Sequence, residues 1–116
     1  MVQNMSKPGT RAYSAYSHDA LQLLAQLIRR ARIERKLTTQ GVAERAGVSR
    51  GLIQRIERGD PGCAIGAVFE VAAIVGVRLF DADRPMVAER LAANAATLAL
   101  LPRSVRLSAA KVVDDF

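Results

Sequence analysis

The chain has 116 residues, half of them hydrophobic, and a formal net charge of +6. This length allows one small domain with terminal extensions. A single cysteine and a single histidine exclude an intrachain disulfide and a four-ligand zinc site, and no apolar run approaches the roughly 20 residues of a transmembrane helix. The basic balance favours a polyanionic partner, and we expect a cytoplasmic protein.

The N-terminal part consists of an arm followed by a long helix. Residues 1–16 are polar, rich in small side chains and aperiodic, so we expect little order in them. The spacing of apolar residues then predicts a helix over residues 17–36, with Ser17 as its N-cap. Its predicted core stripe consists of Leu21, Leu24, Leu27, Ile28 and Ala31.

Two short helices joined by a glycine turn are predicted within residues 38–59. Thr38 is suited to cap the first helix, Gly47 to end it, and Ser49 to cap the second. The buried faces are predicted to contain Val42, Ala43, Ala46, Ile53 and Ile56. A helix, a glycine turn and a second helix with a long polar face form the layout that places a reading helix in the DNA major groove.

Positive charge is concentrated around this pair of helices. Residues 29–58 contain nine basic and three acidic residues, so the whole net charge of +6 falls here, and we expect contact with double-stranded DNA. Arg50 and Arg55 are the predicted main base readers, because arginine binds guanine O6 and N7 bidentately. Alternatively, Arg55 contacts only phosphate. Ser49, Gly51 and Gln54 complete the base-reading set, and the predicted phosphate contacts are Arg29, Arg30, Arg35, Lys36, Thr39, Gln40, Arg45 and Arg58.

Three further elements follow the basic region. A nearly all-apolar fourth helix is predicted over residues 64–76, ending at Gly76. The alternating run Val77, Arg78, Leu79, Phe80 and Asp81 predicts a short strand. Because one strand cannot satisfy its own backbone groups, we expect it to pair with its copy in a second subunit. Asp83 and Pro85 predict the start of a fifth helix over residues 84–100, which Pro102 ends.

The expected organisation is a mainly α chain in four parts: a flexible arm at 1–16, a DNA-binding domain at 17–76, a strand and helix for dimerisation at 77–101, and a flexible tail at 102–116. The tail combines apolar, acidic and aromatic residues, which is typical of a segment that orders on a protein partner. A frayed terminus is the alternative. The predicted partner contacts are Val112, Val113, Asp114, Asp115 and Phe116.

The two short helices resemble the repressor/Cro (XRE) class of helix-turn-helix proteins. The matching residues are Leu37 and Thr38, the run at 43–49, and the Ile-Glu-Arg-Gly run at 56–59. The resemblance implies a five-helix, lambda repressor-like domain. It also implies an ion pair between Arg32 and Glu57 that fixes how the first and third helices meet. The family often has glutamine where this chain has Thr39, with Gln40 next.

Residues 16–83 further resemble the HipB-type antitoxins of bacterial toxin–antitoxin pairs. The features in common are the Tyr-Ser pair at 16–17, the Gly-Asp-Pro-Gly turn at 59–62 before a helix containing phenylalanine, and the run at 77–81. The resemblance implies a homodimer that binds a palindromic operator, represses its own operon and inhibits a HipA-like serine/threonine kinase toxin. The alternative is a stand-alone dimeric XRE regulator without a toxin.

Enzyme chemistry is not predicted. The sequence offers no phosphate-binding glycine loop after a strand, no cluster of metal ligands and no Ser/His/Asp set that spacing would join. We therefore expect no cofactor and no metal. A cytoplasmic protein held at the nucleoid by its DNA contacts is the resulting expectation.

Overall fold

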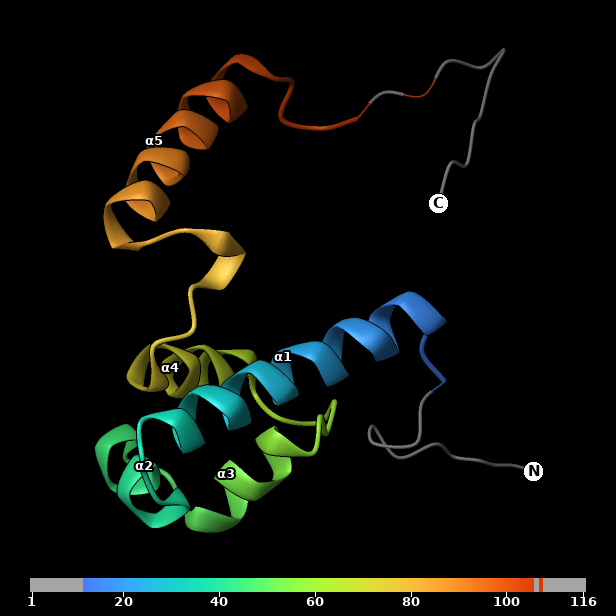
Figure 1. The fold of residues 1–116 in the computed structure, drawn as a ribbon. Coiled ribbons are helices and arrows are strands. Elements are labelled where there is room, and N and C mark those ends of the chain that lie inside the picture. The colour runs from blue at the N-terminus through green and yellow to red at the C-terminus, as the bar shows by residue number, and fades with distance from the viewer. Residues whose placement is uncertain (1–11, 106, 108–116) are drawn as a thin grey trace, which may run out of the picture. The chain divides into compact units, whose positions relative to one another are not determined.

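A computed structural model describes residues 12–105 and 107, and five α-helices lie within them (Figure 1). The chain divides into two compact units, one ending at Asp81 and the other beginning at Ala82. The first unit contains the first four helices and the second contains the fifth. The expectation of a mainly helical, five-helix fold is confirmed.

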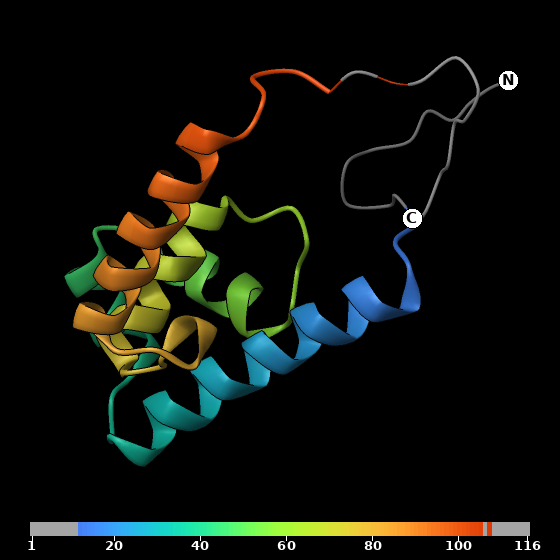
Figure 2. The ribbon, with the colours of Figure 1, turned by 90° about the horizontal axis from the view of Figure 1, so that it is seen from above.

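Helix α1 (Ala15–Glu34) begins and ends two residues before its predicted limits. Ser14 is its N-cap, and the backbone N–H of Ser17, the expected cap, donates to the Ser14 hydroxyl over 3.2 Å. At the other end Lys36 has a φ of 58°, so the chain has left the helix. The first turns of α1 extend past the other helices of the unit (Figure 1, Figure 2).

Helices α2 (Thr39–Ala46) and α3 (Arg50–Glu57) form the predicted helix-turn-helix. The Thr38 hydroxyl accepts from the Gly41 N–H at 2.9 Å, and the Ser49 hydroxyl accepts from the Leu52 N–H at 3.1 Å. Gly47 ends α2 in the left-handed conformation. The three predicted boundary residues are therefore confirmed.

One core joins the four helices of the first unit. Helix α4 (Ile65–Val75) packs against α1 and α2, and the largest fully buried side chains are Ile28, Val42, Ile53, Val71 and Val75. The predicted stripe on α1 is partly wrong, because Ala25 is buried whereas Leu27 is 40% exposed. This packing leaves the opposite side of α3 open to solvent.

Two long side chains, one from α1 and one from its C-cap, lie across the glycines that follow α3 and α4. The Gln22 amide donates to the Arg58 carbonyl over 3.2 Å, and a Cβ at Gly59 would lie 2.9 Å from Gln22 Cδ. At Gly76 a Cβ would lie 2.6 Å from Cζ of Arg35. Both glycines have positive φ, 76° and 89°, so backbone conformation and close contact each favour glycine there.

The strand predicted at residues 77–81 is absent from the described part of the chain. Leu79–Asp81 form a 3₁₀ turn, η2, in which Phe80 and Asp81 have φ values of 56° and 52°. Val77 and Leu79 pack against the core, and the Phe80 ring meets the Phe69 ring edge-on at 6.2 Å. The alternating pattern thus reflects a turn packed on the core. Within the described residues there is no neighbouring strand to which this segment could hydrogen-bond.

Helix α5 (Arg84–Leu100) has the predicted start and end. The Asp83 carboxylate accepts from the Met86 N–H at 3.0 Å, and Pro85 lies in the first turn. None of its residues is buried. Within the described residues no helix combines the length and the apolar character that crossing a bilayer requires. The predicted partner contacts at 112–116 lie outside the described residues.

Candidate nucleic-acid interface

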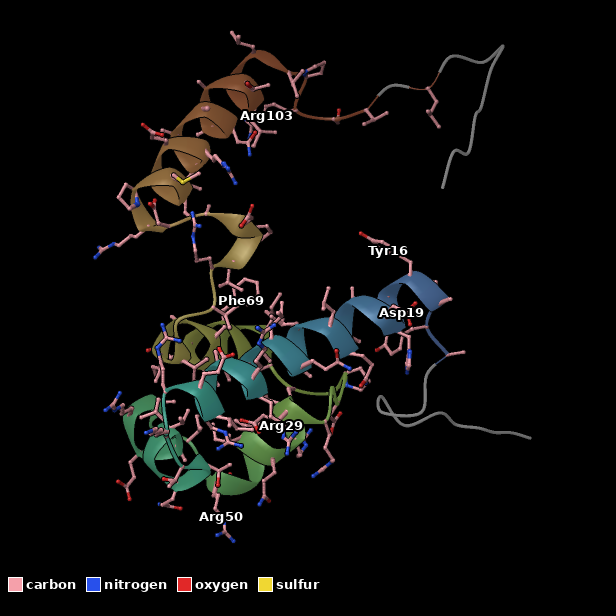
Figure 3. All side chains as sticks on the ribbon, viewed as in Figure 1. Tyr16, Asp19, Arg29, Arg50, Phe69 and Arg103 are labelled. Atoms are coloured by element: carbon pink, nitrogen blue, oxygen red, sulfur yellow. The ribbon has the colours of Figure 1, made fainter. Side chains whose placement is uncertain are left out.

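The outward face of α3 is polar and exposed to solvent. Ile53 and Ile56 are buried on its inner side, whereas Arg50, Gly51, Gln54 and the C-cap Arg58 are exposed. In Figure 3 the Arg50 side chain points away from the unit, on the side opposite to Phe69 of α4. The structure therefore groups four residues predicted to contact DNA on one surface, which we call the α3 face.

The starts of α2 and α3 hold three more predicted contacts. The Ser49 hydroxyl oxygen is used in capping α3, which leaves its O–H as a donor. Thr39 is half-buried in the first turn of α2. The Gln40 side-chain amide donates to the Glu44 carboxylate over 3.1 Å, which holds it along the helix surface.

Arg32 and Glu57 join α1 to α3 through a bidentate ion pair. Arg32 Nε and one terminal nitrogen donate to the two Glu57 oxygens at 2.6 and 3.0 Å, and the other terminal nitrogen donates to the Leu37 carbonyl at 2.9 Å. The side chains are only 13% and 7% exposed. The Glu57 hydrogen bond raises the pKa of Arg32. This arginine is therefore a structural tie, although it belongs to the basic region.

Arg55 is tied to the turn that follows its own helix. Its Nε donates to Oδ2 of Asp60 over 2.8 Å, and Oδ1 of Asp60 accepts from the Gly62 N–H at 2.8 Å. The Arg55 hydrogen bond, followed by that from Gly62, lowers the pKa of Asp60. The Arg55 side chain is 43% exposed and lies at the edge of the α3 face. Sequence reasoning missed this pair, whose only signal is an aspartate five residues after an arginine.

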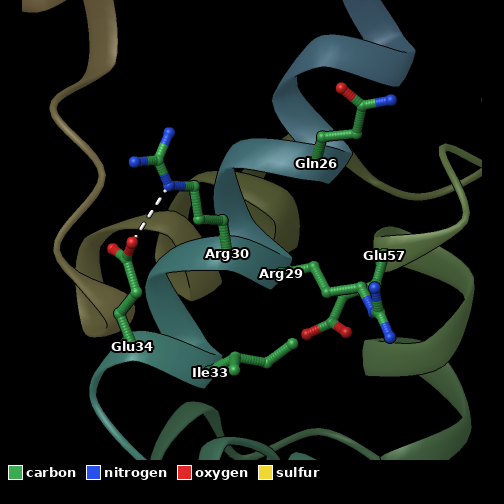
Figure 4. A pocket seen from close by; sticks show the side chains of 6 residues that line it. All are labelled: Gln26, Arg29, Arg30, Ile33, Glu34 and Glu57. Atoms are coloured by element: carbon green, nitrogen blue, oxygen red, sulfur yellow. Dashed lines mark hydrogen bonds and ion pairs between the residues drawn. The ribbon is translucent and has the colours of Figure 1, made fainter.

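Two of the predicted phosphate contacts lie on α1 beside a groove between α1 and α3. The groove has a volume of about 430 Å³ (Figure 4) and is lined by Gln26, Arg29, Arg30, Ile33, Glu34 and Glu57. Arg30 is engaged with Glu34 in an exposed ion pair at 3.0 Å. Arg29 forms no ion pair within the described residues, so it is the better placed of the two to meet a phosphate.

The remaining predicted phosphate contacts are distributed unequally. Arg35 lies over Gly76 at the end of α4, where a cation is favoured by the helix dipole, and so is not brought to the α3 face. Lys36 is exposed in the turn before α2, Arg45 in the last turn of α2, and Arg58 at the end of α3. None of these three forms an ion pair within the described part of the chain.

Comparison with protein families finds one match, a helix-turn-helix domain, over residues 23–93. The matched segment covers most of α1, all of α2, α3 and α4, and the first half of α5. No curated protein and no solved structure matches the chain.

Proposed function

We propose that this chain acts as a sequence-specific transcriptional repressor with α3 as its reading helix. The chain belongs to the family of helix-turn-helix domains and is a DNA-binding protein. The observation that carries the proposal is the α3 face, where Arg50, Gln54 and Arg58 are exposed on a helix whose opposite side is fixed in the core. A capped, amphipathic helix of this kind can enter the major groove without disturbing the fold.

The side chains on the α3 face have distinct proposed roles. Arg50 offers a bidentate donor pair to guanine, and Gln54 offers a donor and an acceptor to adenine. Gly51 leaves room between them for a thymine methyl or a closely approaching backbone phosphate. Ser49 is an auxiliary donor, and Arg55 reads from the edge of the face. Proposed phosphate contacts are Arg29, Lys36, Thr39, Gln40, Arg45 and Arg58, with Arg30 and Arg35 the least supported by their positions.

The proposed assembly is a homodimer on a palindromic operator, with its reading helices about one DNA turn, ~34 Å, apart or a multiple of that. Support comes from α5, whose Val87, Leu91 and Leu98 are 39%, 70% and 66% exposed. Pairing of residues 77–81 between subunits would require Phe80 and Asp81 to leave the left-handed region. We therefore assign the main dimer contact to α5 and a secondary one to that segment.

The finer proposal is that the repressor is the antitoxin of a HipA-like kinase toxin and has no enzymatic activity of its own. Its support is the resemblance of residues 16–83 to HipB-type antitoxins, with the exposed α5 and the tail as candidate contacts. The alternative is a stand-alone dimeric regulator at the nucleoid. Recovery of a kinase with the tagged full-length chain from its native cell would support the antitoxin role, and its repeated absence would favour the alternative.

DNA reading is tested by selecting duplexes from a random pool with the full-length protein, then comparing Arg50→Ala with a matched control. Arg103→Ala removes the same charge from an exposed position in the second unit. We expect Arg50→Ala to lose ~1–3 kcal/mol on the selected duplex and less on a scrambled one. The control should leave the ratio of the two affinities unchanged. An equal loss on both duplexes for Arg50→Ala would contradict the proposed reading role.

A further inference from the structure

We infer that Asp60 is a specificity-determining residue, which directs the Arg55 guanidinium toward neutral base edges and away from phosphates. The inference rests on the proposed function, because it concerns how one arginine of the reading helix selects among DNA contacts. Asp60 itself makes no contact with DNA in this scheme. It acts through Arg55 and is therefore a positioning residue.

The turn after α3 holds the Asp60 carboxylate firmly beside Arg55. The Asp60 N–H donates to the Arg55 carbonyl over 3.1 Å, so the backbone closes back on the residue whose side chain it binds. Gly59 makes this closure possible with its φ of 76°. One carboxylate oxygen is fixed by the Gly62 N–H at 2.8 Å, which leaves the other aimed at Arg55 Nε, also at 2.8 Å.

This geometry uses only part of the donor capacity of Arg55. A guanidinium carries five N–H donors, and the contact with Asp60 through Nε leaves the two terminal nitrogens. Those are the atoms that meet guanine O6 and N7 in a bidentate contact. With its side chain 43% exposed, Arg55 retains access to DNA while its direction is fixed.

A fixed carboxylate distinguishes the two kinds of acceptor that DNA presents. A phosphate approaching Arg55 would bring a second negative charge close to Asp60, which is unfavourable, whereas a guanine edge is neutral. The other arginines at α3 differ in this respect. Arg50 forms no ion pair within the described residues, and Arg58 interacts with the Asp60 carboxylate only through an electrostatic attraction weaker than that of Arg55. Arg55 is therefore the arginine at α3 whose general affinity for phosphate is reduced the most.

Asp60→Asn tests the inference, since it removes the charge but keeps the size and one oxygen acceptor. Glu34→Gln is the matched control: it makes the same charge change and also releases an arginine, Arg30, from an exposed ion pair. Arg30 belongs to α1 and not to the α3 face, so its release should add no contact with a base edge. Affinities are measured with the full chain on a duplex selected by the wild-type protein and on a scrambled duplex.

We expect Asp60→Asn to strengthen binding to the scrambled duplex more than to the selected duplex. Between about 50 and about 200 mM salt, its scrambled-duplex affinity should fall by about threefold more than that of the wild type, the value for one extra phosphate contact. Glu34→Gln should change both affinities by one common factor. The inference is overturned if Asp60→Asn also changes both affinities by one common factor. It is overturned as well if the scrambled-duplex affinity of Asp60→Asn depends on salt as that of the wild type does.

A double-mutant cycle with Arg55→Gln separates positioning from a general effect of charge or of turn structure. Without Arg55, the Asp60→Asn change should no longer alter the ratio of the two affinities, and an undiminished effect would also overturn the inference. Circular dichroism and thermal unfolding establish that each variant is folded. If the wild-type protein enriches no duplex, the proposed function fails and the inference with it. If the wild type discriminates and Asp60→Asn behaves like Glu34→Gln, only the inference fails.

Discussion

Replacing Glu57 with alanine should destabilise the first unit strongly, because it leaves the Arg32 guanidinium without its carboxylate. The Glu57 side chain is 7% exposed and accepts two hydrogen bonds from Arg32, at 2.6 and 3.0 Å. Removing one partner of a buried pair costs ~3–5 kcal/mol. Arg32 keeps 13% exposure and its bond to the Leu37 carbonyl, so we expect the lower end, ~3 kcal/mol.

Thermal and urea unfolding of the full chain measure this loss. For a domain of this size, ~3 kcal/mol corresponds to a fall in Tm of roughly 12–24 °C, and the urea midpoint should fall without a change in m-value. Glu34→Ala is the control, because it breaks an ion pair whose side chains are 60% and 74% exposed. Such a surface pair contributes at most about 1 kcal/mol.

The same pair allows a second test, in which both partners are replaced. If the cost arises from an uncompensated charge, replacing both partners, as in Arg32→Met with Glu57→Leu, should recover much of the stability that Glu57→Ala loses. A double variant as unstable as the single one would refute that explanation. A loss for Glu57→Ala no larger than that for Glu34→Ala would refute the energetic role of the buried pair altogether.

Three other outcomes are expected. Gly76→Ala should lower the Tm of the protein more than Gly47→Ala does. Both glycines have positive φ, but only a Cβ at Gly76 meets another side chain, that of Arg35. A chain truncated after Asp81 should fold, and in light scattering it should remain monomeric at concentrations where the proposed dimer of the full chain forms. A dimeric truncation would exclude α5 as the main contact. The NMR titration midpoint of Asp60 should lie below the ordinary 3.8, because Arg55 favours the ionised form. Any stability that ionised Asp60 provides is therefore present above pH 3.8 and is lost as the pH falls through the lower pKa of the folded protein. Arg55→Gln should move the titration midpoint of Asp60 back up.

Helix boundaries were predictable where a single residue determines them. Thr38, Gly47, Ser49 and Asp83 act through contacts within a few positions of themselves, and sequence contains all of that information. The segment at 77–81 is different, because alternation of apolar and polar residues suits a strand and also a turn packed on a core. The choice between a strand and a turn depends on whether a neighbouring strand is available for hydrogen bonding, and that information lies outside the segment.

The candidate site was predictable to the extent that helical periodicity determines exposure. Arg50, Gln54 and Arg58 follow from the burial of Ile53 and Ile56 on the opposite side of α3. The pairing of Arg55 with Asp60 and the position of Arg35 over Gly76 depend on how the chain returns after a turn. Sequence identifies the basic residues, whereas tertiary structure decides which of them are already engaged.

The Gln22 side chain lying across Gly59 affects how genetic screens of this protein should be interpreted. Any larger residue at 59 must adopt a positive φ and displace the amide that donates to the Arg58 carbonyl. Cells carrying such changes would show weaker DNA binding because less folded protein accumulates, although position 59 lies two residues after the end of α3. A screen scored by DNA binding alone would therefore count a packing position as a contact with DNA. Measuring protein abundance in the same cells would separate the two classes of allele.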